Sequence, residues 1–106
     1  MNTDKAKELA KKWIKQRPMP QELSPAEVWE VLAGLGFEPK GKNSDHTTFR
    51  WKHNHLLNDE TLFKFGIISI SVGHSQGHKT VIRVDSIKKL IRALNIYFEH
   101  ENKKES

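Results

Sequence analysis

The amino-acid sequence predicts one α+β domain, a three-stranded antiparallel sheet with one face covered by two amphipathic helices. Apolar residues recur at helical spacing in segments 24–35 and 85–98, as in helices with one buried side. Between them, segment 65–72 (FGIISISV) alternates apolar and polar residues, as a half-buried strand does. A chain of 106 residues has the length of one domain. The expected order is a leading helix and then helix, three strands and helix, with the second sheet face open.

The first 23 residues are expected to form an additional helix and a connector. Residues 4–16 place Trp13 and other apolar residues on one side at helical spacing and lysines on the other. Three prolines follow within RPMPQELSP, which is typical of a connecting segment. Because its apolar side must be buried, this helix is expected to dock on the domain. Docking on the open sheet face would make it autoinhibitory.

The main domain is expected to span residues 24–98. Ser24 is a natural N-cap that completes a capping box with Glu27, and Asp85 is the expected N-cap of the last helix. Residues 99–106 are expected to be a disordered tail. The remaining segments are predicted as an edge strand at 37–40, a second strand at 46–52, a loop at 54–60, the strand at 65–72 and a polar loop at 73–79.

Composition points to a polyanionic partner. The net charge is +5 and the isoelectric point is near 9.6, a balance typical of domains that bind nucleic acid. No cysteine is present, which excludes disulfides, thiolate nucleophiles and cysteine-based zinc sites. No apolar stretch has the length of a membrane span or the place of a signal peptide, so a cytoplasmic location is expected.

The second predicted strand carries the residues of greatest chemical interest. If Phe49 and Trp51 point into the core, the alternate residues point to the open face, where cations can hold a phosphodiester beside an imidazole. An exposed histidine on a basic strand is otherwise an ordinary surface residue. The open face is predicted to carry His46, Thr48, Arg50, Lys52, Ser69 and Ser71.

Two longer stretches resemble the HicA (YcfA-like) toxins of bacterial toxin–antitoxin pairs. They are LAGLGFEPKGKNSDHTTFRW and ISISVGHSQGHKTVIRVDSIKKLIRAL, and the resemblance covers about residues 24–98. It implies a double-stranded-RNA-binding-domain-like fold, mRNA interferase activity and neutralisation by a HicB-like antitoxin protein. It also implies that His46 is the catalytic histidine and that His74 is the loop histidine of the family.

The chain departs from that family pattern in several places. Ser44 and Asp45 replace a Gly-Ser pair, Thr47 replaces a second histidine, and Val72 stands where a proline is expected. Asp45 beside His46 either tethers the imidazole and raises its pKa or repels phosphate. Two alternatives to the ribonuclease therefore stay open, a non-catalytic RNA-binding module of the same fold and a protein-interaction domain.

The expected chemistry is RNA cleavage that needs neither a metal nor a cofactor. His46 would take the proton of the ribose 2′-hydroxyl as it attacks phosphorus, and His74 would act as general acid or orienting group. Arg50, Lys52 and Lys79 would neutralise the phosphate.

Three other patterns have plainer interpretations. The polar loop at 73–79 is either an anion-binding concavity or a plain connector. His53 and His55, with His74 and His78, would make a metal site only if the fold gathered them. Trp13 and Trp29 are typical of core residues rather than of platforms for base stacking.

Overall fold

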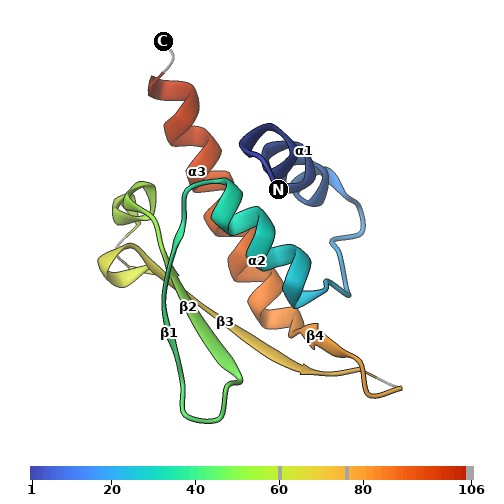
Figure 1. Ribbon diagram of the computed structural model, residues 1–106. Coiled ribbons are helices and arrows are strands. Elements are labelled where there is room, and N and C mark those ends of the chain that lie inside the picture. The colour runs from blue at the N-terminus through green and yellow to red at the C-terminus, as the bar shows by residue number, and fades with distance from the viewer. Residues whose placement is uncertain (60, 76, 105–106) are drawn as a thin grey trace.

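The computed structural model describes residues 1–59, 61–75 and 77–104, with side chains as far as residue 102, and it confirms the α+β class (Figure 1). Three helices and four strands make up these described residues, with two short 3-10 turns between the second and third strands. They are α1 (Thr3–Lys15), α2 (Pro25–Gly34), β1 (Glu38–Lys42), β2 (Thr48–Lys52), η1 (Asn54–Asn58), η2 (Lys64–Gly66), β3 (Ile67–His74), β4 (Thr80–Ile82) and α3 (Val84–Lys104).

The sheet is antiparallel in the order β1-β2-β3-β4, so the expectation of three strands is wrong. The additional strand is β4, which pairs Ile82 with Val72 and Thr80 with His74. Three residues are too few for the alternation that identifies a strand in a sequence. His74 consequently ends a strand and does not lie in a loop.

The pairing of β2 with β3 agrees with the predicted pattern of faces. Phe49 is opposite Ile70 and Trp51 is opposite Ile68, so these four side chains lie on one face of the sheet. The strand bounds differ from expectation at both ends of this pair. β2 begins at Thr48 and leaves His46 outside it, while β3 runs from Ile67 to His74.

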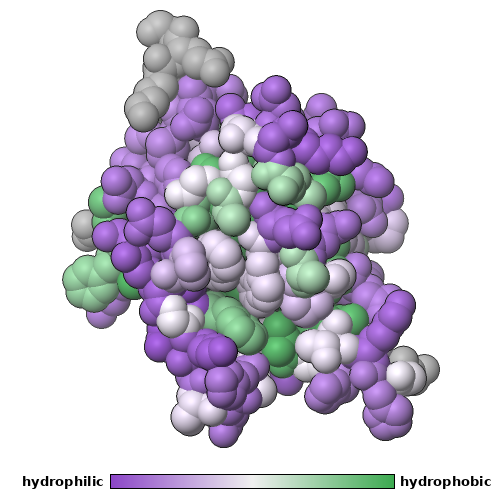
Figure 2. All heavy atoms as spheres, viewed as in Figure 1, coloured by the Kyte–Doolittle hydropathy of each residue, from purple (hydrophilic) through white to green (hydrophobic). Residues whose placement is uncertain are grey.

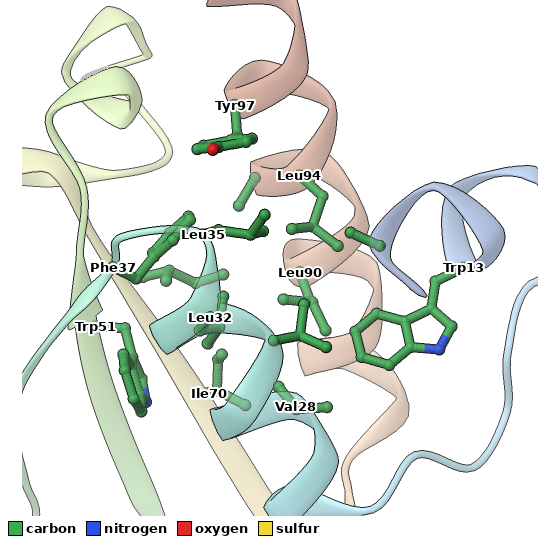
Figure 3. Packing of buried hydrophobic residues seen from close by; sticks show 14 of the residues in the cluster. Trp13, Val28, Leu32, Leu35, Phe37, Trp51, Ile70, Leu90, Leu94 and Tyr97 are labelled. Atoms are coloured by element: carbon green, nitrogen blue, oxygen red, sulfur yellow. The ribbon is translucent and has the colours of Figure 1, made fainter. Parts of the chain in front are cut away.

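One face of the sheet is covered by α2 and α3, and the core lies between them (Figure 3). Leu32 of α2, Leu90 and Leu94 of α3 and Ile70 of β3 are buried there. Each of these positions was part of a predicted apolar stripe. The opposite face carries no helix among the described elements (Figure 1).

The helix starts differ in detail from the predicted caps. Ser24 occupies the N-cap position of α2, but its side chain makes no capping hydrogen bond, so the capping box is not formed. The last helix begins at Val84, which places Asp85 in its first turn rather than at the N-cap. No helix among the described residues is both long and apolar enough to cross a membrane.

The N-terminal helix docks on the domain, as expected. Its apolar side, with Ala6, Ala10 and Trp13 buried, packs on α2 and α3, and Trp13 points from α1 toward their shared core (Figure 3). In Figure 1, α2 and α3 lie between α1 and the sheet. The autoinhibitory arrangement, in which α1 would cover the open sheet face, is therefore not the one observed.

A close approach of backbone and side chain fixes α1 against α2. A Cβ atom at Gly34 would lie 2.7 Å from Cβ of Ala6, well inside contact distance. We expect Gly34→Ala to destabilise the protein by about 1–3 kcal/mol, although alanine favours a helix intrinsically. Adding Ala6→Gly should restore part of that loss. Urea unfolding of the two single variants and the double variant measures the coupling, and additive changes would contradict the contact.

The C-terminal end of the chain is more ordered than predicted. α3 continues to Lys104, so residues 99–104 are helical where a disordered tail is expected, and residues 105–106 lie outside the described part. The reason is contact with the rest of the domain. Glu101 approaches Nε2 of His55 at 2.8 Å and Nζ of Lys7 at 3.9 Å.

Residues 54–59 of the predicted loop at 54–60 also belong to the packed structure, and residue 60 lies outside the described part. η1 and η2 fold over the end of the sheet, and Leu56 and Phe63 enter the core. Arg92 of α3 donates to the carboxylate of Asp59 at 3.1 Å. This segment is thus part of the domain rather than a plain connector.

Candidate functional site

The turn between β1 and β2 is organised by one side chain, Asn43. Its Oδ1 accepts hydrogen bonds from the backbone N–H groups of Thr47 and Thr48 at 2.8 and 3.0 Å. Its Nδ2 donates to Oγ1 of Thr47 at 2.9 Å. The backbone of Asn43 closes the turn by accepting from the N–H of His46 at 3.1 Å. The conformation at His46 is therefore fixed by local hydrogen bonds.

His46 lies in this turn and not at the beginning of the strand. Its φ is 57°, in the left-handed region that non-glycine residues seldom adopt, and its side chain is exposed. The predicted alternation with Arg50 and Lys52 therefore does not extend to His46. Backbone strain of this kind gathers at functional sites in proteins, which makes His46 a candidate site residue.

A surface depression brings His46 and His74 together. It has a volume of about 470 Å³ and lies between the β1–β2 turn and the β3–β4 hairpin. His46 enters from the turn, His74 from the end of β3 and Thr80 from β4. The two candidate catalytic residues, 28 positions apart in the chain, thus line one site. The full lining is Asp45, His46, Thr47, Val72, Gly73, His74, Thr80 and Arg83.

Arg83 is the functional candidate that sequence reasoning missed. It follows β4 directly, and its N–H donates to the carbonyl of Ser71 at 2.9 Å, which anchors its backbone to β3. Its side chain lies over Gly73, where a Cβ would meet Cγ of Arg83 at 3.5 Å. It also approaches Asp85 at 4.0 Å, a pair exposed enough to leave the guanidinium accessible. The sequence alone does not single out Arg83, because β4, which brings it beside His74, was not predicted.

The other predicted cations lie outside this depression. Arg50 is exposed on β2, opposite Ser69. Lys52, at the far end of β2, lines a different depression of about 290 Å³ together with His53. Lys79 is exposed in the β3–β4 turn and does not contribute to the lining. These three residues are therefore separate from the pair of histidines.

The open face itself has the predicted polar character. Thr48 and Ser71 lie opposite each other and their hydroxyl oxygens are 3.1 Å apart. The next pair along the strands is Arg50 with Ser69. This face presents hydroxyl groups and a cation beside the depression.

The structure does not gather the four histidines of the conceivable metal site. His53 and His55 follow the end of β2, where Lys52 pairs with Ile67, the first residue of β3. His74 is the last residue of β3, about 23 Å away along that strand. His55 is buried and bonded to Glu101, and Nδ1 of His53 accepts from the N–H of His55 at 3.0 Å. Within the described ranges, no three His, Asp or Glu side chains form a group able to hold a metal ion.

Tyr97 completes the cluster around His53 and His55. Its ring stacks on that of His55, with centroids 5.3 Å apart, and meets His53 edge-on at 5.1 Å. Burial raises the pKa of Tyr97 above its usual 10.0, and the charge of Glu101 adds to that rise. The cluster joins the end of the sheet to α3, which is a structural role.

The depression holds groups that suit acid–base chemistry on an anion. Two imidazoles can transfer protons, and a guanidinium can hold a phosphate oxygen. Asp45 adds a carboxylate to the same lining. Comparison with family models, with curated proteins and with solved structures finds no match for this chain. The likeness to HicA therefore rests on the quoted residues alone.

Proposed function

We propose that this protein is a HicA-like endoribonuclease with a double-stranded-RNA-binding-domain-like fold that acts on mRNA in the cytoplasm. One observation carries the proposal, namely that His46, His74 and Arg83 line a single depression. The net charge of +5 supports RNA as the ligand. A HicB-like antitoxin would be the protein partner that restrains the activity.

The proposed reaction is attack by a ribose 2′-hydroxyl on the adjacent phosphorus. His46 accepts the hydroxyl proton while the new P–O bond forms, and His74 gives a proton to the departing 5′-oxygen. The products are a 2′,3′-cyclic phosphate and a 5′-hydroxyl end. Arg83 would hold the phosphate oxygens as negative charge builds up on them. Arg50 and Lys52 would bind the RNA backbone outside the depression, and Lys79 would contact it at the hairpin tip.

The test is a turnover assay with purified protein and a defined RNA. Cleavage that leaves 2′,3′-cyclic phosphate and 5′-hydroxyl ends, and that persists in EDTA, is the expected result. Loss of all cleavage in EDTA would contradict the mechanism. Complete absence of cleavage, with RNA binding retained, would leave the non-catalytic module as the function.

One observation favours that non-catalytic alternative. Asp45 lines the same depression as the histidines and places a carboxylate where a phosphate would bind. In this alternative the fold and the basic face serve only to bind RNA. Asp45→Asn should raise RNA affinity under either function, because it removes a negative charge from the depression. Cleavage by this variant is expected only if the protein is a ribonuclease.

The charge of the open face gives a prediction about salt. Arg50→Ala combined with Lys52→Ala should weaken RNA binding and lower the slope of log affinity against log salt, by about 0.7 for each lost contact with a single strand. Anisotropy measurements over a range of salt concentrations check this. The matched control is Lys12→Ala combined with Lys15→Ala on α1, which lies away from the sheet. An equal change in both pairs would move the RNA surface elsewhere.

A further inference from the structure

Another hollow, here called the aromatic groove, lies apart from His46 and His74. Its lining includes Trp29 of α2, Phe49 and Trp51 of β2, and Gly41, Lys42 and Arg50, around a volume of about 370 Å³. Figure 2 shows apolar atoms exposed in the lower middle of that view, between α2 and the hydrophilic β1–β2 hairpin. The groove therefore combines an apolar floor with a polar rim.

The three aromatic rings form one continuous surface. Trp29 stacks on Trp51 with centroids 5.8 Å apart and an interplanar angle of 22°, and it meets Phe49 at 5.0 Å. Trp51 is buried, whereas Trp29 and Phe49 are only half-buried. Trp29 is thus core on one side and accessible on the other, so the interpretation of this residue as ordinary core is incomplete.

The rim of the groove is shaped by a bulge in β1. The pairing of β1 with β2 shifts register between Pro39 and Lys42. Gly41 has a φ of 108° there, and a Cβ atom added to it would meet nothing within 4 Å. The bulge therefore leaves open space beside the rings.

The charges of the lining are of one sign. Lys42 and Arg50 are its charged residues, and no carboxylate belongs to the lining. Lys42 is opposite Phe49 and shares its face of the sheet, whereas Arg50 is opposite Ser69 and belongs to the open face. Aromatic rings next to cations are the arrangement that proteins use for single-stranded nucleic acid, where bases stack on the rings and phosphates meet the cations. A purely apolar peptide would leave the ammonium group of Lys42 without a partner.

We infer that the aromatic groove binds one unpaired base of a single-stranded RNA, with Lys42 on a flanking phosphate. This inference rests on the proposed function in taking RNA as the ligand, but it does not depend on cleavage. The base stacks on the accessible sides of Trp29 and Phe49. The RNA strand then continues across β2 toward the open face, where Thr48 and Ser71 lie.

The experiment uses a labelled 2′-O-methyl hexaribonucleotide, which has no free 2′-hydroxyl and cannot be cleaved by the proposed route. Fluorescence anisotropy measures its affinity for the full chain. Phe49→Leu and Trp29→Leu should each weaken binding by about 5- to 150-fold, as expected when one base loses its stacking partner. The matched control is Phe65→Leu, which alters an aromatic residue that is 75% exposed on another part of the surface.

Two further measurements keep the test decisive if a groove variant is poorly folded. Lys42→Ala should weaken binding, whereas Lys40→Ala, whose ammonium group pairs with Glu38 at 3.3 Å, should not. An abasic oligomer of equal length should bind the wild-type protein at least about 5-fold more weakly than the base-bearing one.

Equal affinities for wild type, Phe49→Leu and Lys42→Ala would overturn the inference even if the protein cleaves RNA. The same holds if the abasic oligomer binds as tightly as the base-bearing one. If no oligonucleotide binds and the groove instead mediates self-association, the occupant is a protein and the inference is wrong. Binding that depends on the groove, in a protein that cuts no RNA, would support the inference and contradict the proposed catalysis.

Discussion

Replacing His46 with alanine is expected to lower RNA cleavage by about 10²- to 10⁴-fold, the usual contribution of a positioned general base. The imidazole lies in an exposed turn and is not part of the core, so the fold should survive its loss. RNA affinity should change little, because a group that transfers a proton contributes little to holding the backbone. Single-turnover rates and anisotropy on the same preparation measure the two effects separately.

The matched control for this variant is His78→Ala. His78 is also exposed, also has a left-handed φ of 65°, and lies in the neighbouring hairpin turn without lining the depression. The His78→Ala variant should therefore cleave RNA at the wild-type rate. Equal rates for His46→Ala and wild type would remove His46 from the mechanism, and equal losses in both variants would point to a structural effect of the turns.

His74 provides an internal check on the same site. If His46 and His74 act in one reaction, the double variant should be scarcely slower than the worse single variant, because catalytic groups that act together are not additive. Independent roles would instead multiply the two losses.

Periodicity was informative wherever a segment was long enough to show it. Segment 65–72 placed Ile68 and Ile70 on the buried face, and the structure confirms that placement. β4 was missed because its three residues, Thr80–Ile82, show no readable period. That omission had a consequence for the site, since β4 is what brings Thr80 and Arg83 beside His74.

Side-chain hydrogen bonds explain the error in placing His46. The strand expected at 46–52 begins at His46. Asn43 instead holds the N–H groups of Thr47 and Thr48 and postpones the strand to Thr48. Alternation is a property of extended backbone, so it gives no side-chain direction for a residue with a φ of 57°.

The excursion between β2 and β3 was hidden for a different reason. Segment 54–66 has no regular period because its two turns are short and of the 3-10 type. Its packing on α3 depends on contacts distant in sequence, such as Asp59 with Arg92 and His55 with Glu101. Nothing local in the sequence distinguishes Phe63, which is buried, from Phe65, which is exposed.

That contrast gives the largest expected effect on stability. Phe63 is only 1% exposed and is among the largest fully buried side chains, so Phe63→Ala should leave a cavity and cost about 3–5 kcal/mol of unfolding free energy. Small domains have about 5–15 kcal/mol in total, so this variant should be close to unfolding at physiological temperature. Urea unfolding followed by tryptophan fluorescence measures the loss.

Phe65 is the matched control two positions away. Its side chain is 75% exposed and its φ is 60°, so Phe65→Ala removes almost no buried area and should change stability by less than about 0.5 kcal/mol. Phe65→Gly should raise stability by up to about 1 kcal/mol, because glycine adopts a left-handed backbone without strain. Comparable losses for Phe63→Ala and Phe65→Ala would contradict the burial of this segment. The carbonyl of Gly66, in the same segment, accepts a hydrogen bond from the N–H of His53, which follows β2. Such a result would therefore also count against the pairing of β2 with β3.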